Sequence, residues 1–188
     1  EMQFFVRPGE ELDWFAKWKQ ARLNWHKALG LGDQKYRYHD HDKLAHYANA
    51  ACDIEFEFPF GFKELEGIAY RSNFDLNQHM KFSGKDLSVY DDALKTSYVP
   101  HVVECSVGTD RLFLTLLFNA YHEDTVDGET RVSLKLSPNI APYKAAFMPL
   151  TKKQEEATHK IFKSILKKDI SVCYDESGSI GKRYRRQD

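Results

Sequence analysis

The sequence predicts an α+β fold, in which an antiparallel sheet backed by helices precedes a smaller α/β unit. Residues 53–58 alternate strictly between polar and apolar side chains, which is the period of a strand with one solvated face. The run 112–118 is apolar nearly all round, as expected of a helix buried behind a sheet. Residues 144–174 form a strand–helix–strand pattern, which predicts a parallel pair with a right-handed crossover.

The first elements along the chain are a strand and a long helix. Residues 1–6 have the composition of a strand interior, and residues 9–29 carry apolar side chains at helical spacing. The three tryptophans of this helix are assigned to core packing, because aromatic stripes at this spacing pack far more often than they bind ligands.

Three further strands of the sheet follow the helix. They are expected at 52–59, 63–71 and 99–106, and the polar stretch that joins the second to the third is expected to be loop. Glu55 and Glu57 are assigned to the solvated face of the first of these strands.

The remaining residues predict a second domain. Residues 131–136 alternate again, and Pro138 and Pro142 then suit a domain boundary. We therefore expect a first domain at 1–137 and a second at 138–188.

The composition is that of an ordinary globular protein, with 188 residues, 42% hydrophobic residues and a formal net charge of -1. Three widely spaced cysteines favour neither a disulfide framework nor a thiolate zinc site, so a reducing compartment is expected. No apolar run approaches the roughly 20 residues of a membrane helix, and the expected location is the cytoplasm, with no membrane partner. We expect the chain to be a fragment of a longer protein, cut at both ends.

One group of candidate ligands lies where a strand, a glycine turn and the first turn of a helix meet. Glu104 and Ser106 share one face of the strand by parity, and together they can accept hydrogen bonds from an ammonium group. Arg111 follows at the start of the helix, where backbone amides favour anions, so its guanidinium suits a polyphosphate. The residue types alone leave an alternative open, which is an N-capping Asp110 beside a surface arginine.

A second group lies in the strand 63–71. Arg71 can form a bidentate contact with a substrate carboxylate, and Glu64 can hold a ribose hydroxyl or a magnesium-bound water. Strand parity opposes a shared face, because the two residues are seven apart. A bulge at Gly67 would place Glu64 and Arg71 on the same face of the strand.

Three long stretches give the sequence a family resemblance. Residues 58–76 (FPFGFKELEGIAYRSNFDL), 98–117 (YVPHVVECSVGTDRLFLTLL) and 174–188 (YDESGSIGKRYRRQD) resemble, in order, signature stretches of the dimeric class II glycyl-tRNA synthetases. The opening EMQFFVRPGEE and residues 132–150 are similar to further parts of that family, so the resemblance covers essentially the whole chain. It implies part of the antiparallel class II catalytic core, followed by the start of an anticodon-binding domain.

The resemblance also implies a role for each matching residue. Arg71 takes the carboxylate of glycine, and Arg111, which belongs to motif 3, is the catalytic arginine on the terminal phosphates of ATP. The implied glycine-binding residues are Glu1, Arg71, Glu104, Cys105, Ser106, Val107 and Gly108. The implied ATP-binding residues are Glu64, Leu65, Gly108, Thr109, Asp110 and Arg111. Cys105 and Thr109 stand where proline and valine are more usual in the family.

The implied reaction is the two-step charging of a tRNA. Glycine attacks the α-phosphate of ATP, with Mg²⁺ as cofactor, and the adenylate then passes glycine to tRNA(Gly); the resemblance also implies a homodimer. Motif 1 and the arginine-bearing loop of motif 2 belong before Glu1, so these 188 residues alone are expected to be inactive. The alternative is a non-catalytic, synthetase-like protein that binds nucleic acid or an accessory partner, which should have lost the charges that Arg71, Glu104 and Arg111 retain.

Two further clusters of side chains could bind nucleic acid or a metal ion. The run 182–186 interleaves a tyrosine ring with positive charges, which is usually a solvated surface, but the resemblance favours tRNA binding by Arg183, Arg185 and Arg186. His39, His41 and His46 invite a metal hypothesis. Because no further ligand pattern supports a closed site, no metal is predicted there.

Overall fold

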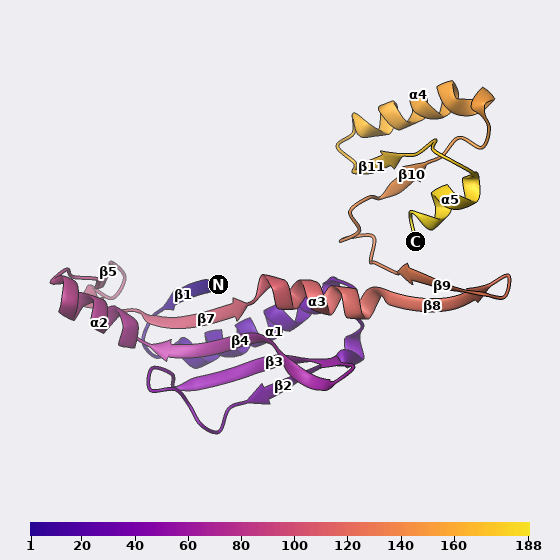
Figure 1. The fold of residues 1–188 in the computed structure, drawn as a ribbon. Helices are drawn as coiled ribbons and strands as arrows, with labels where there is room; N and C mark the ends of the chain where they lie inside the picture. The colour runs from indigo at the N-terminus through magenta and orange to yellow at the C-terminus, as the bar shows by residue number, and fades with distance from the viewer. The chain divides into compact units, whose positions relative to one another are not determined.

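The computed structural model describes residues 1–188, which form two compact units, Glu1–Asn119 and Ala120–Asp188. The first unit is built on a five-stranded sheet of order β1-β7-β4-β3-β2, in which every neighbouring pair is antiparallel (Figure 1). Its strands are β1 (Met2–Val6), β2 (Tyr36–Asp40), β3 (Ala50–Phe58), β4 (Gly61–Ser72) and β7 (His101–Val107). The mixed fold with an antiparallel sheet that the sequence predicts is confirmed.

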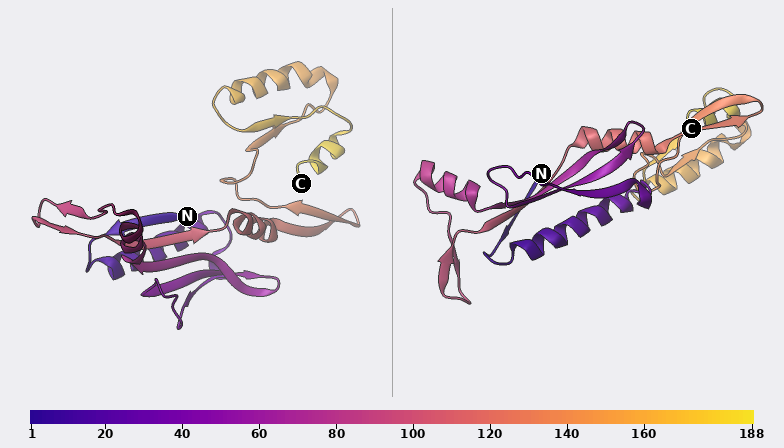
Figure 2. Two further views of the ribbon diagram at one scale, coloured as in Figure 1. Left: turned by 60° about the vertical axis from the view of Figure 1, so that its left-hand side comes forward. Right: turned by 90° about the horizontal axis from the view of Figure 1, so that it is seen from below.

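Helix α1 (Glu11–Ala28) covers one face of this sheet (Figure 2). Acidic residues occupy its first turn and basic residues its last turn, which complements the helix dipole. Trp14 and Trp18 pack against the core, as expected from their spacing. The same expectation is wrong for Trp25, which is 39% exposed and lies beside the Arg22 guanidinium, 4.3 Å from the ring centre.

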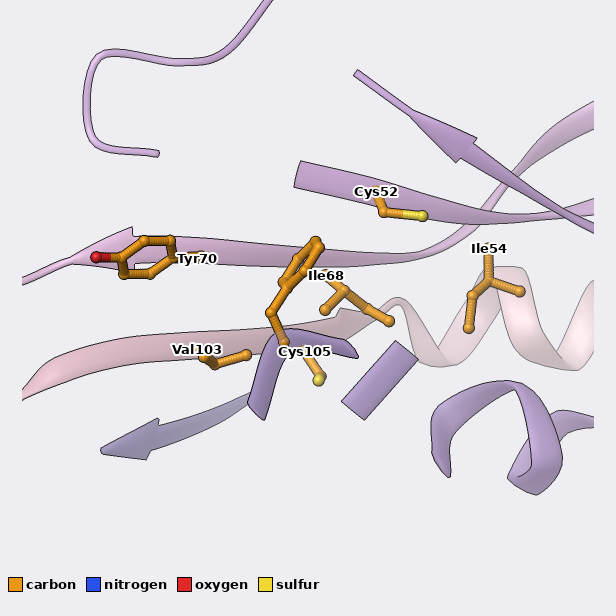
Figure 3. Packing of buried hydrophobic residues seen from close by; sticks show 7 residues of the cluster. Cys52, Ile54, Ile68, Tyr70, Val103 and Cys105 are labelled. Atoms are coloured by element: carbon orange, nitrogen blue, oxygen red, sulfur yellow. The ribbon is translucent and has the colours of Figure 1, made fainter. Parts of the chain in front are cut away.

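The main core lies between α1 and the sheet (Figure 3). It is formed by alternate residues of the central strands, together with one phenylalanine of the helix: Phe15, Cys52, Ile54, Ile68, Tyr70, Val103 and Cys105. Burying each large apolar side chain contributes about 1.5–3 kcal/mol. Because side chains alternate along a strand, the residues between these core positions face away from α1.

The stretch expected to be loop contains regular structure. Helix α2 (Phe74–Ser83) follows β4, and a hairpin of β5 (Val89–Asp91) and β6 (Thr96–Tyr98) follows the helix. The expectation is wrong because α2 buries no residue, so its apolar positions carry no helical period. The helix ends at Gly84, whose φ of 69° is left-handed and whose N–H donates to the Met80 carbonyl.

Glu55 is not solvated as expected. Its side chain does face away from α1, but it is only 8% exposed, and its carboxylate lies 2.5 Å from Nε of Arg37 on the neighbouring strand. Parity predicts the face of a residue but not whether a neighbouring side chain covers it. Glu57, two residues later, is exposed as expected.

Helix α3 (Thr109–Ala120) is less buried than its sequence predicts. Leu112 and Leu116 pack on a second cluster formed by Leu31, Phe56, Phe58 and Leu65. The rest of its apolar surface is exposed, at Phe113, Leu114 and Phe118. The expectation of a fully buried helix is wrong, because the sheet covers only one side of it.

The second unit contains the predicted β-α-β pattern. The parallel pair of β10 (Ala145–Phe147) and β11 (Val172–Tyr174) is connected through α4 (Glu155–Leu166), which confirms the prediction. The other elements of this unit are the hairpin β8 (Tyr121–Val126) and β9 (Glu129–Leu134), and the short helix α5 (Ile180–Arg185). Two short 3₁₀ helices also occur, η1 (Asp33–Lys35) in the first unit and η2 (Lys152–Gln154) in the second.

The boundary between the units falls earlier than the prolines suggest. The Leu134 amide donates to the Asp188 carbonyl at 2.7 Å, and the Arg131 guanidinium lies 3.9 Å from the Asp188 carboxylate, so the hairpin belongs with the C-terminal residues. Pro138 and Pro142 therefore lie in a connection inside the second unit. The assignment of 1–137 and 138–188 to two functional domains stays a prediction. None of the helices has both the length and the apolar composition needed to cross a bilayer.

Candidate functional site

Three adjoining cavities lie along the sheet, two of them on the face opposite α1. Two rows of cross-strand neighbours run under these two cavities: Ala51, Ala69, Glu104 and Gln3 form one row, and Asp53, Gly67 and Ser106 form the other. The central strand β4 contributes only glycine and alanine to these rows. Polar side chains from the flanking strands therefore surround open space above β4.

The first cavity, of about 430 Å³, contains Arg71 and Glu104. Nη1 of Arg71 lies 3.3 Å from Oε1 of Glu104, so the two opposite charges share one cavity. Asp75, at the start of α2, accepts from Nε and Nη2 of Arg71 at 2.7 and 3.2 Å, and the guanidinium carbon lies 4.0 Å from the centre of the Tyr47 ring. These contacts hold the guanidinium in one orientation. The hydrogen bond to Asp75 raises the pKa of Arg71 and lowers the pKa of Asp75.

Glu1 joins this group through Gln3. Nε2 of Gln3 donates to Oε1 of Glu1 at 2.7 Å and also to the Glu104 carboxylate. The structure thus brings together Glu1, Arg71 and Glu104, which the resemblance assigns to one substrate, although they are more than 30 residues apart in sequence.

The second cavity, of about 240 Å³, adjoins the first at Glu104 and is lined by Ser106, Glu64 and Gly67. The parity problem of β4 is solved by a bulge, but not at Gly67. Glu64 lies opposite Glu55 and Glu66 lies opposite Ile54, so Leu65 is the extra residue. The predicted position of the bulge is therefore wrong, whereas its predicted effect, which brings Glu64 onto the cavity face, is confirmed.

The third cavity, of about 330 Å³, adjoins the second at Glu64 and is lined by Arg111 and Phe60. Nη1 of Arg111 donates to the main-chain oxygen of Glu64 at 2.8 Å and lies 3.5 Å from its carboxylate. Both side chains remain about half exposed, so the guanidinium is accessible to an anion.

Within the first turn of α3, Arg111 is the residue that lines the third cavity. Thr109 and Asp110 are exposed and already lie inside the helix, and the Leu112 amide donates to the Gly108 carbonyl at 2.9 Å. Gly108 therefore lies at the N-cap position. The alternative in which Asp110 caps the helix is not supported.

Six residues assigned to the site line none of the three cavities: Gly108, Thr109 and Asp110 at the start of α3, and Leu65, Cys105 and Val107 in the strands. Leu65 and Cys105 are buried against α3 and α1, where burial raises the pKa of the Cys105 thiol to about 12. The side chains of Leu65, Cys105 and Val107 point elsewhere, because each residue alternates with a cavity-facing neighbour or occupies the bulge, and their assignment to the site stays a prediction. Only their main-chain groups remain available.

Comparison with known proteins finds relatives that match the whole chain. No protein-family model matches the chain. Over its whole length, however, the chain is 52% identical to the glycine–tRNA ligase of Chlorobaculum tepidum, 50% identical to that of Caldanaerobacter subterraneus and 47% identical to that of Bacillus anthracis. The chain is thus similar over its whole length to part of each of these glycine–tRNA ligases. It spans 40–41% of the length of these relatives.

A solved structure supports the fold of the chain. The Giardia lamblia prolyl-tRNA synthetase in complex with prolyl-adenylate is similar with a TM-score of 0.63. The match covers 97% of this chain and 37% of that chain, at 13% sequence identity, and it therefore bears on the fold alone. It agrees with a class II synthetase core.

Several polar residues of the candidate site were not predicted from the sequence. Gln3, Tyr47 and Asp75 contact the predicted ligands directly. Asp75 could have been found from its position four residues after Arg71, where a helical turn brings the two side chains together. Gln3 could have been found from strand parity with Glu1. Nothing in the local sequence places Tyr47 beside Arg71.

A buried charge cluster lies on the other face of β4, below the site. Glu66 is 1% exposed, and its carboxylate lies 2.6 Å from Nε of Arg22 and 2.6 Å from Nε2 of His26, both on α1. Burial alone would raise the pKa of Glu66, but the hydrogen bonds from His26 and Arg22 outweigh it and lower the pKa. Glu66 follows the Leu65 bulge directly, so the cluster anchors this bulge to α1.

The basic run near the C-terminus is only partly accessible. Arg183 is 8% exposed and donates to the carbonyls of Gly178 and Pro149, so its expected role in tRNA binding needs correction: this guanidinium holds the second unit together. Arg186 pairs with Asp175. Arg185 and Tyr184 remain exposed.

Proposed function

We propose that the protein containing this chain is a glycine–tRNA ligase that activates glycine with ATP and transfers it to tRNA(Gly). The observation that carries the proposal is the opposed pair of Arg71 and Glu104, 3.3 Å apart in a cavity that adjoins, through the second cavity, the one lined by Arg111. Glycine has a carboxylate and an ammonium group but no side chain, so two opposite charges at a short separation are the features that can recognise it.

The roles of the glycine-binding residues follow from charge. Arg71, oriented by Asp75 and Tyr47, binds the substrate carboxylate, and Glu104 accepts hydrogen bonds from its ammonium group together with Ser106. Glu1 adds a second carboxylate through Gln3. Selection against larger amino acids rests on exclusion, because the pocket must leave no room beside the α-carbon.

The roles of the ATP-binding residues follow from the third cavity. Arg111 and the N-terminus of α3 attract the terminal phosphates, and Glu64 lies where a ribose hydroxyl or a magnesium-bound water would bind. The Glu64 carboxylate fits Mg²⁺, because it is half exposed and offers oxygen ligands. When bound, Mg²⁺ would neutralise charge on the phosphates. This chain's residues contribute mainly by positioning and by charge stabilisation.

The family also bears on the partners and the location of the protein. Glycine, ATP and tRNA(Gly) are its expected substrates, a homodimer is its expected assembly, and the cytoplasm is its expected compartment. Residues 138–188 are assigned to the start of an anticodon-binding domain, and residues 1–137 to the catalytic domain.

The decisive experiment is glycine-dependent exchange between ATP and pyrophosphate, measured on the intact protein with the residues that flank this chain. Exchange should require glycine, and Arg111→Ala should lower it by roughly 10²- to 10³-fold, the loss typical of a group that stabilises developing charge. Lys95→Ala is a suitable control, because Lys95 lies on the exposed β5–β6 turn. Absence of exchange, with tRNA binding retained, would favour the non-catalytic alternative.

A further inference from the structure

Two histidines at the edge of the sheet lie beside two carboxylates of the next strand. His39 of β2 is opposite Asp53 of β3, and His41 follows on the same face, with its amide donating to the Ala51 carbonyl at 3.0 Å. One ligand atom from each of His39, His41 and Asp53 lies within 4.8 Å of the other two. The sheet thus supplies a third ligand that the local sequence does not contain.

The side chains have room to converge. His41 lies opposite Ala51, whose small side chain lets the imidazole lean across, so Nε2 of His41 lies 2.8 Å from Oδ2 of Asp53. The His39 and His41 rings are 5.4 Å apart. In a tetrahedral zinc site with bonds of about 2.0–2.1 Å, neighbouring ligand atoms are about 3.3 Å apart. The His39 side chain is 58% exposed, so it can rotate and bring its ring nitrogen closer to the other two ligand atoms.

Glu55 gives His39 the orientation that a metal ligand needs. Oε1 of Glu55 lies 3.3 Å from Nδ1 of His39, while Arg37 holds the other oxygen of this nearly buried carboxylate. A proton on Nδ1 that is shared with Glu55 leaves the lone pair of Nε2 free. Histidine ligands of metals commonly donate their second ring N–H to a carboxylate in this way.

We infer that His39, His41 and Asp53 form a binding site for a divalent transition-metal cation of the zinc type. Two imidazoles and one carboxylate favour Zn²⁺, Cu²⁺ or Ni²⁺ over Mg²⁺ or Ca²⁺, which prefer oxygen ligands alone. Three protein ligands leave at least one coordination position open. Because His41 and Asp53 also line the second cavity, with Glu64 and Ser106, the open position is at its rim. The inference does not rest on the proposed function.

The test measures zinc affinity in the intact protein by competition with a chromophoric chelator. His39→Ala, His41→Ala and Asp53→Asn should each weaken the binding of one Zn²⁺ by at least tenfold. His122→Ala is the matched control, because the His122 side chain is 37% exposed against 36% for His41, and it also lies near an aspartate, Asp124. It should leave zinc affinity unchanged. Equal affinities in all four variants and the native protein would overturn the inference, as would the absence of zinc binding.

A second measurement avoids any effect of the substitutions on folding. In the native protein, substoichiometric Zn²⁺ should shift the imidazole NMR signals of His39 and His41 before those of the other histidines of this chain. The site would be contradicted if other histidines shifted first, or if no histidine signal shifted. The contacts among His39, His41 and Asp53 would then be only polar contacts between neighbouring strands.

Discussion

At the scale of single residues, the candidate site depends on how Arg71 is held. A guanidinium on a flexible side chain recognises a carboxylate efficiently only if its orientation is fixed before the substrate arrives. Asp75 takes two of its N–H groups, Tyr47 covers its face and Glu104 approaches from a third side. The remaining donors are therefore directed into the first cavity.

Replacing Asp75 should weaken glycine recognition specifically. Asp75→Asn removes the charge that fixes Arg71, so the KM for glycine in pyrophosphate exchange should rise roughly 10- to 100-fold, with the KM for ATP nearly unchanged. Asp92→Asn provides the control, because the Asp92 side chain is 90% exposed and pairs only with Lys95. A parallel rise in both KM values would point to a general structural defect and would contradict the positioning role.

Site residues could be predicted from the sequence where the charge of the side chain and its position along a strand were enough to place it. Arg71, Glu104, Ser106 and Arg111 carry charges or hydroxyls at a strand end and at a helix start, and each lines one of the cavities. The side chains of Cys105 and Leu65 lie in the core instead, because a matching sequence stretch does not reveal which of its side chains face the cavities. Arg183 was misassigned because composition does not distinguish a solvated arginine from one that is buried against carbonyls.

At the scale of elements, the irregularity of β4 decides which side chains share a face. The Leu65 bulge lets Glu64 and Arg71, seven residues apart, both face the cavities, and Glu66 then points into the core. The sequence predicts β1, α1, β3, β4, β7 and the β-α-β unit, because their apolar residues recur with a clear period. It misses β2, α2, the β5–β6 hairpin and β8, which bury few or no side chains and therefore have no clear period.

The Glu66 cluster should make the stability of the first unit depend on pH. The pKa of Glu66 is lowered in the folded state from its usual 4.5, so its contribution is fully present above about pH 4.5 and is lost as the pH falls through the lower folded pKa. Glu66→Gln should cost about 3–5 kcal/mol at neutral pH, because it leaves the Arg22 charge without its buried partner.

This prediction is checked by urea unfolding between pH 7 and pH 3. The native protein should lose stability below pH 4.5, and Glu66→Gln should show a flatter dependence in that window. Glu57→Gln is a suitable control, because Glu57 lies on the same sheet but is exposed. An identical pH profile for Glu66→Gln and the native protein would show that Glu66 is not ionised in the folded state.

At the scale of the whole molecule, the two units have separate sources of stability. The first is held by the core under its sheet, whereas the second buries few large side chains and relies on polar anchors such as Arg183.

Arg183→Ala removes charged hydrogen bonds to Gly178 and Pro149, each of which contributes about 1.5–3 kcal/mol. Amide hydrogen exchange should accelerate in residues 144–186 while β3 and β4 remain protected. Faster exchange in both units would show that they unfold together.

Arg185 of the basic run is expected to affect tRNA binding but not glycine activation. Arg185 is exposed beside Tyr184 and is paired only with Asp188 at 3.5 Å, so it is the guanidinium of this run most available to phosphates and unstacked bases. In the intact protein, Arg185→Gln should weaken tRNA binding, with a smaller salt dependence, because one phosphate contact is lost. Glycine-dependent pyrophosphate exchange without tRNA should be unchanged, because Arg185 lies outside the three cavities.

Lys168→Gln, which neutralises another exposed charge of the second unit, is the control for a non-specific effect of charge. If Arg185→Gln and Lys168→Gln bind tRNA as the native protein does, the basic run is a solvated surface; if exchange falls as well, the effect of Arg185 is structural.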